Sequence, residues 1–215
     1  MRNIRIATGE HYHVYNRGNE KRRIFHDEKD LARFLTLLLC CQAPIYFPHF
    51  QRLANELIKA KTLQLKEETL KEIVRKRYVA LESFGLISNH FHLGVQQTKS
   101  YGISNYMQRV LNAYTKYYNT KYERSGHLFQ GPFKIKYVET NKQLLYLSSY
   151  IHRNPRELQG WKGKEDQYFW SSYQDYTKNN RWGLLLKTDM VLDQFNGSEE
   201  YKEFVDTSSA KTDFE

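Results

Sequence analysis

Two strand-like runs, 78–87 (YVALESFGLI) and 90–96 (HFHLGVQ), are separated only by Ser88 and Asn89. So short a connection joins antiparallel neighbours, because parallel strands need a crossover of a dozen residues or more. Two further runs that fit strands lie at 10–16 (EHYHVYN) and 133–138 (FKIKYV). The chain therefore predicts an α+β fold with an antiparallel sheet rather than a doubly wound parallel one.

Helical periodicity lies between these strands and after the last of them. Asp27 can cap a helix that runs to about Cys41. The charged segment from Phe50 to Arg77 predicts one or two surface helices inserted into the domain. A long amphipathic helix is expected over 103–122, and another over 141–154. We expect Asn141 to cap this last helix and Pro155 to end it, because the residue before a proline disfavours helical geometry.

Charge is unevenly distributed along the chain. The 215 residues contain 33 Lys and Arg against 24 Asp and Glu, a formal charge of +9. Residues 189–215 hold eight acids and two lysines, which leaves +15 on residues 1–188. Basic residues interleaved with 17 Tyr, 12 Phe and 3 Trp suit unpaired nucleic acid, whose bases stack on aromatic rings. Composition leaves open a merely basic protein with a tyrosine-rich core.

The chain contains no apolar run of the roughly 20 residues that a membrane helix needs, and its first residues lack an apolar signal core. We therefore expect a cytoplasmic, nucleoid-associated protein. Cys40 and Cys41 are adjacent in a helix-like run, which is poor geometry for a mutual disulfide. They are expected to be buried thiols in a reducing compartment.

The segment NHFHLGV, residues 89–95, carries the first chemical signal. Side chains alternate along a strand, so His90 and His92 share one face while the apolar residues share the other. Two adjacent imidazoles can bind a divalent metal if further ligands come from elsewhere. A pair of ordinary polar histidines is the alternative.

The helix predicted over 141–154 adds a second signal. Tyr150 and Asn154 are four residues apart and so lie about one turn from each other on the same face. Asn154 can offer a carbonyl oxygen to a hard metal, and Tyr150 can offer a phenol as nucleophile. A phenol with a pKa of about 10 is weak at neutral pH and needs electrostatic help. Tyr150 as a core aromatic is the alternative.

Four motifs resemble one known family. They occur in order over about residues 10–176 as YHVYNRGNEKRRIF, SNHFHLGV, SGHLFQGPFK and SSYIHRNP, the last followed by WSSY. Together they resemble the single-tyrosine HUH transposases, in the subgroup of the insertion-sequence-200-like domain and the REP-associated tyrosine transposases. The resemblance implies a ferredoxin-like antiparallel sheet with helices on one side, and cleavage of single-stranded DNA near hairpins.

By the same resemblance, the two family histidines are His90 and His92, the nucleophile is Tyr150, and the third metal ligand is Asn154. The sequence departs from the family at Ile87-Ser88, where relatives carry Met-Pro, which alters the turn but removes no ligand. We expect residues 1–180 to form the nuclease domain, with 44–76 as a helical insertion. Residues 181–215 would form an acidic C-terminal extension that has no family counterpart.

The resemblance implies a DNA transposase that cuts and rejoins hairpin-associated single strands through a 5′-phosphotyrosine, with Mg²⁺ or Mn²⁺. It would act as a monomer or a homodimer. One alternative is a non-catalytic protein that kept the fold and binds hairpin DNA or RNA. Another is a metal-dependent hydrolase that uses water.

Other residues complete the set of candidates. His127 is expected to touch phosphate or water. His11 and His13 are expected to have structural or DNA-contact roles, because no tyrosine-bearing helix is predicted near them. Crowding on the helix over 103–122 makes four tyrosines competing nucleophiles: Tyr114, Tyr117, Tyr118 and Tyr122. The residues expected to bind DNA are Arg17, Arg22, Arg23, Gln130, Lys134, Lys136, Arg153 and Arg156.

Overall fold

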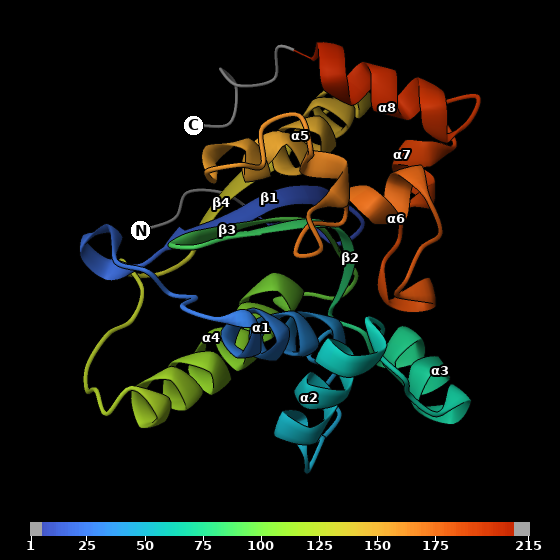
Figure 1. Ribbon diagram of the computed structural model, residues 1–215. Coiled ribbons are helices and arrows are strands. Elements are labelled where there is room, and N and C mark those ends of the chain that lie inside the picture. The colour runs from blue at the N-terminus through green and yellow to red at the C-terminus, as the bar shows by residue number, and fades with distance from the viewer. Residues whose placement is uncertain (1–5, 209–215) are drawn as a thin grey trace.

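The computed structural model describes residues 6–208 and contains a four-stranded antiparallel sheet (Figure 1). The strand order across the sheet is β2–β3–β1–β4, which is the order of a ferredoxin-like sheet. The four predicted strands are all present, each within about a residue of its expected bounds. They are β1 (His11–Arg17), β2 (Val79–Ile87), β3 (His90–Gln97) and β4 (Lys134–Val138).

The pairing of β1 with β3 separates the two faces of the sheet. Val14 pairs with Leu93 on the apolar face, and both side chains are fully buried. Tyr15 pairs with His92 on the opposite, polar face, and Arg17 pairs with His90. The alternation along each strand therefore places the predicted histidine pair on a face of its own.

Helices α1 (Glu28–Cys40) and α4 (Gly102–Lys121) cover the apolar face. Asp27 caps α1 as predicted, and its carboxylate accepts a hydrogen bond from the Asp30 backbone N–H at 3.0 Å. The charged insertion forms two helices, α2 (Phe50–Ala60), which packs on α1, and α3 (Glu67–Lys76). Cys40 and Cys41 are buried free thiols, as predicted.

The opposite face is covered by α5 (Asn141–Arg153), so helices pack on both sides of the sheet and the expected one-sided packing is wrong (Figure 1). The reason is a second apolar core, in which Leu147 and Ile151 of α5 meet aromatic residues from the C-terminal part of the chain. The predicted cap is also wrong by one residue. Thr140 caps α5, because its side-chain oxygen accepts from the Gln143 N–H at 3.2 Å.

Gly85 of β2 lets α5 lie close to the sheet. A Cβ atom at this position would stand 3.0 Å from the carbonyl oxygen of Ile151, which is tighter than ordinary van der Waals contact. Gly85 pairs with His92 on the neighbouring strand. The helix therefore approaches the sheet at the level of the histidine pair.

After α5 the chain forms short elements that pack around this helix. They are α6 (Tyr173–Thr177), α7 (Asp189–Leu192) and α8 (Ser198–Thr207). Tyr201 of α8 contacts α5 directly, since its hydroxyl lies 2.6 Å from Nδ1 of His152 and 3.0 Å from the Ser148 hydroxyl. Short 3-10 turns lie at Asn19–Lys21, Asn154–Glu157, Glu165–Gln167 and Gly183–Leu185.

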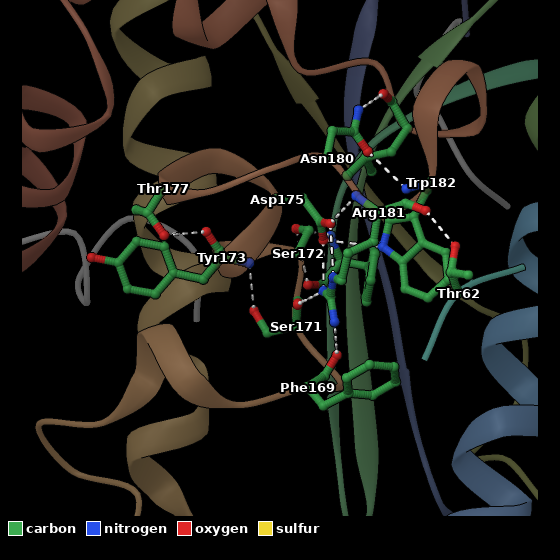
Figure 2. A network of polar contacts seen from close by, with 12 residues as sticks. Thr62, Phe169, Ser171, Ser172, Tyr173, Asp175, Thr177, Asn180, Arg181 and Trp182 are labelled. Atoms are coloured by element: carbon green, nitrogen blue, oxygen red, sulfur yellow. Dashed lines mark hydrogen bonds and ion pairs between the residues drawn. The ribbon is translucent and has the colours of Figure 1, made fainter. Parts of the chain in front are cut away.

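A buried ion pair anchors the segment between α5 and the chain end. Figure 2 shows Arg181 bonded to Asp175 at 2.7 Å and to the carbonyl oxygen of Phe169. Thr62, in the inserted segment, donates to the carbonyl oxygen of Arg181 at 2.9 Å. The network ties the insertion to the segment after α5. Residues 209–215 of the predicted acidic extension lie outside the described residues, and the proposed boundary at 180 stays a prediction.

Among residues 6–208, no helix is both long and apolar enough to cross a membrane.

Candidate active site

The polar face of the sheet opens into a cleft of about 410 Å³. His90 and His92 stand on its floor, and each is only 6% exposed. Strand β1 supplies one wall, β4 and the preceding loop another, and the end of α5 closes the third. The residues lining the cleft are Tyr15, Asn16, Arg17, His90, His92, Gln130, Lys134, Tyr150 and Glu157.

Tyr150 reaches this cleft from α5. Its ring meets His92 edge-on, with the centroids 5.2 Å apart and the ring planes at 88°. The next residue, Ile151, is the one that packs against Gly85, so the close approach of the helix brings Tyr150 onto the histidines. The tyrosine that the sequence selected as nucleophile therefore lies beside the histidine pair.

Asn154 lies one turn after Tyr150, as the helical spacing predicted. Its Oδ1 atom is 3.1 Å from Nε2 of His90. The other ring nitrogen of His90, Nδ1, is 2.6 Å from Oδ1 of Asn89. A carboxylate oxygen of Glu157 is 3.9 Å from His90 Nε2. The structure thus places His90, Asn154 and Glu157 around one point.

Burial keeps both histidines neutral at pH 7. Loss of hydration and, to a smaller extent, the charge of Arg17 together lower the pKa of His90 to about 4. The pKa of His92 is lowered well below its ordinary value, first by burial and then by His13 and His90. Neutral imidazoles keep the lone pair that a metal ion requires.

The contacts of His90 test whether a cation fits. A neutral imidazole carries a single N–H, yet both ring nitrogens of His90 face carbonyl oxygens. If the hydrogen serves the shorter contact, to Asn89, the lone pair on Nε2 faces the lone pairs of Asn154. A positive ion between these two atoms would satisfy both. The residues present therefore fit a divalent cation.

The donor set also suits such an ion. Two imidazole nitrogens, an amide oxygen and a nearby carboxylate match Mn²⁺ well and Mg²⁺ acceptably. No group of three or more His, Cys, Asp or Glu arranged to hold a metal occurs among residues 6–208. The candidate set thus depends on the amide of Asn154 in addition to the two histidines.

Three of the predicted DNA-binding residues line the cleft, namely Arg17, Gln130 and Lys134. The other five residues predicted to bind DNA do not line the cleft. For all eight, contact with DNA stays a prediction. Arg22 bonds to Glu20 at 3.1 Å, Arg156 pairs with buried Glu165 at 3.0 Å, and Lys136 stands on β4 opposite His13. Arg23 is exposed, and Arg153 is half-buried at the end of α5.

Sequence reasoning placed His13 away from any tyrosine-bearing helix, and this expectation is wrong. The His13 ring lies 5.9 Å from that of Tyr150, and its Nε2 is 2.8 Å from Nδ1 of His92. Glu157 was missed as well. The sequence does contain a signal for His13. The predicted strands over 10–16 and 90–96 both carry a His-x-His pattern, and pairing these two strands would bring both histidine pairs to one face of the sheet.

Three of the competing tyrosines lie on α4 and Tyr122 directly follows its last residue; the helix is across the sheet from the cleft, and none of the four lines the cleft. Their hydroxyls hydrogen-bond to groups of α1 and of the segment just before it. Tyr114 donates to the carbonyl oxygen of Ile24, and Tyr117 and Tyr122 donate to buried Asp30. These contacts indicate packing roles. His127 is exposed in the loop before β4 and is not a lining residue.

Comparisons with known proteins bear on the family and the fold of this chain. A sequence model of the family described as "Transposase IS200 like" matches residues 51–154, a span that includes His90, His92, Tyr150 and Asn154. A solved structure of a REP-associated tyrosine transposase bound to a REP hairpin superposes with a TM-score of 0.53. The two chains are 11% identical, and the match covers 88% of this chain and 93% of the other.

No match was found among curated proteins. The family match and the shared fold nevertheless agree on one group of proteins. The resemblance of this chain to the IS200-like and REP-associated tyrosine transposases is thereby confirmed.

Proposed function

We propose that this protein is a single-stranded DNA endonuclease and strand transferase with Tyr150 as its nucleophile. The observation that carries the proposal is the edge-on contact of Tyr150 with His92, at 5.2 Å, in a cleft that also holds His90, Arg17 and Lys134. A phenol, two neutral imidazoles and two cations suit attack on a phosphodiester.

In the proposed reaction, the Tyr150 hydroxyl oxygen attacks phosphorus. A P–O bond to tyrosine forms as the bond from phosphorus to the 3′-oxygen breaks. The phenolic proton leaves and the 3′-oxygen gains one, so the products are a 5′-phosphotyrosine and a free 3′-hydroxyl. Attack by a second 3′-hydroxyl reverses the step and joins new strands. Bond energy is conserved, and no nucleotide cofactor is needed.

His90, His92 and Asn154 would hold Mg²⁺ or Mn²⁺, and Glu157 is close enough to contribute. A divalent ion here would polarise the phosphate and stabilise the charge that develops in the transition state. The protein's own contribution is to keep both imidazoles neutral by burial and to hold Asn154 one turn from Tyr150.

The basic and polar residues that line the cleft indicate the class of substrate. Arg17 and Lys134 would neutralise phosphates, and Gln130 can hydrogen-bond a base edge. The structural neighbour is bound to a REP hairpin, which supports hairpin-associated single strands as the substrate. Such a substrate would place the protein with DNA at the nucleoid.

A denaturing gel tests this function. The protein is incubated with labelled single-stranded oligonucleotides, including repetitive hairpins that flank its own gene, with Mn²⁺ or with EDTA. We expect a metal-dependent covalent protein–DNA band that Tyr150→Phe abolishes. Tyr15→Phe is the matched control, because Tyr15 lines the same cleft on β1.

An adduct that persists in Tyr150→Phe would overturn the assignment of the nucleophile. Cleavage without an adduct would indicate a hydrolase that uses water. Tight, salt-sensitive binding with neither product would identify a non-catalytic protein that kept the fold.

A further inference from the structure

His13 occupies an unusual place for a histidine that lies outside the predicted site. It is 0% exposed, so it does not contact DNA at the surface. Its Nε2 lies 2.8 Å from Nδ1 of His92, and the two rings are stacked with centroids 5.0 Å apart. His13 also stacks on Tyr15, with the ring centroids 4.6 Å apart. The ring is therefore held firmly against a candidate ligand.

The pairing of the strands explains how His13 reaches His92. His13 pairs across the sheet with Gly94, and His92 lies two residues before that glycine on the same face. Because Gly94 has no side chain, nothing from that position separates the two rings. A Cβ atom at position 94 would also collide with the hydroxyl of Ser83 on the neighbouring strand β2. Glycine at this position permits the diagonal contact.

Two imidazole nitrogens at 2.8 Å share one hydrogen, so one must donate and the other accept. If His92 donates from Nδ1, its lone pair is on Nε2, the nitrogen not used by His13. If His13 donates, the hydrogen of neutral His92 is on Nε2 instead, where it would block a cation. The direction of this one hydrogen bond therefore decides whether His92 can act as a ligand.

His90 offers an independent comparison within the same cleft. Its Nδ1 is engaged by the carbonyl oxygen of Asn89, and its Nε2 faces Asn154. Both partners are carbonyl oxygens, which only accept; if the single N–H of His90 serves the shorter contact, to Asn89, Nδ1 of His90 is the donor. Both histidines thus have a partner on Nδ1, and an accepting His13 would give His92 the same orientation as His90.

We propose that His13 is a positioning residue, which accepts a hydrogen bond from Nδ1 of His92 and thereby fixes the His92 lone pair on Nε2 for a divalent cation. The proposal deepens the proposed function, and its metal-binding consequence rests on it. The tautomer it assigns to His92 can be observed in the protein without metal or DNA.

The first measurement is the tautomer of His92, from long-range ¹H–¹⁵N correlation spectra of the ¹⁵N-labelled, metal-free protein. The spectrum of His92→Gln identifies the signals of this residue. We expect the Nδ1–H tautomer in the wild type and a shift toward Nε2–H in His13→Leu, which has no acceptor. His13→Gln should restore Nδ1–H, because an amide oxygen can accept.

The second measurement is Mn²⁺ affinity, from the loss of the free-ion signal in electron paramagnetic resonance. We expect His13→Leu to bind Mn²⁺ about 10- to 100-fold more weakly than the wild type, and His13→Gln to recover most of the affinity. His11→Leu is the matched control, because His11 lies on the same strand and face but pairs with Glu82 at 2.9 Å. It should lower thermal stability without changing Mn²⁺ affinity.

The Nε2–H tautomer in the wild type would overturn the proposal, as would wild-type Mn²⁺ affinity in a folded His13→Leu. Equal weakening by His11→Leu and His13→Leu would also overturn it, since that result indicates general destabilisation. A wild type that shows the Nδ1–H tautomer but binds no Mn²⁺ would contradict the proposed metal site and leave the positioning role of His13 supported.

Discussion

Oδ1 of Asn154 lies 3.1 Å from Nε2 of His90, although the two residues stand 64 positions apart in the chain. One atom belongs to the residue that ends helix α5, and the other to β3, the second strand of the predicted hairpin. The contact joins the two halves of the candidate metal site, and it is the most direct place to test that site.

Asn154→Asp should bind Mn²⁺ more tightly than the wild type, because a carboxylate adds a negative charge opposite the ion. Asn154→Leu should weaken binding at least about 10-fold, the range seen when ligand-supporting groups are lost. Isothermal titration with Mn²⁺ measures both. Asn119→Leu, on α4, is the matched control. Equal affinity in Asn154→Leu and the wild type would remove Asn154 from the ligand set.

The protein should lose stability as pH falls. Burial lowers the pKa of His90 to about 4, and those of His13 and His152 to about 3, from an ordinary 6.5. Between these values the unfolded chain binds protons that the folded chain does not, so the free energy of unfolding decreases with decreasing pH. The loss at pH 5 is at most about 2 kcal/mol per histidine.

Urea denaturation from pH 7.5 to pH 5 measures this dependence. The midpoint should decrease steadily below about pH 6.5. Replacing exposed His127 by Asn provides the control, and its curve should follow the wild type. A midpoint that stays constant over this range would show that the buried histidines do not titrate as their environment requires.

Tyr201→Phe should destabilise the fold by about 1–3 kcal/mol. The hydroxyl of Tyr201 contacts both His152 and Ser148 on α5, and its removal leaves buried Nδ1 of His152 without this partner, while Ser148 keeps its bond to the carbonyl oxygen of Leu145. Tyr137→Phe is the control, because the Tyr137 hydroxyl bonds to Glu10 on the exposed edge of the sheet. Thermal melts compare the two variants, and an equal effect would deny Tyr201 a special role in holding α5.

Binding to single-stranded DNA should depend steeply on salt. If about five phosphates are contacted, log affinity should fall with log salt at a slope of roughly −3.5. Arg17→Ala or Lys134→Ala should reduce the magnitude of that slope by about 0.7. Arg52→Ala is the control, since Arg52 lies on α2 and pairs with Glu56 at 2.8 Å. Fluorescence anisotropy across a salt series gives the slopes, and a flat response would contradict a phosphate-dominated interface.

Local periodicity was enough to predict the strands and the two residue pairs that meet in the candidate site. His90 and His92 share a face because strands alternate, and Tyr150 and Asn154 share one because helices turn. Both pairs depend only on neighbours in the chain. Asp27 was predicted as a cap for the same reason, whereas Asn141 and Thr140 have similar capping propensity and the wrong one was chosen.

What the sequence did not predict depends on contacts between distant segments. The meeting of His13 with His92 requires the register of β1 on β3, which no local pattern specifies. Glu157 enters the cleft because the chain continues past Pro155 as a 3-10 turn. The placement of helices on both faces depends on a second core that includes Tyr201, more than forty residues after α5 ends.

Gly85 has a consequence for how the proposed active site could change over time. The position of Tyr150 in the cleft depends on how closely α5 packs on the sheet. That close packing is possible because Gly85 has no Cβ atom. An added methyl at position 85 would press on the carbonyl oxygen of Ile151, the residue after Tyr150, so the end of α5 would have to shift by a few tenths of an ångström. Position 85 therefore acts as a spacer, through which the distance between Tyr150 and the histidine pair can be changed without altering any residue that lines the cleft.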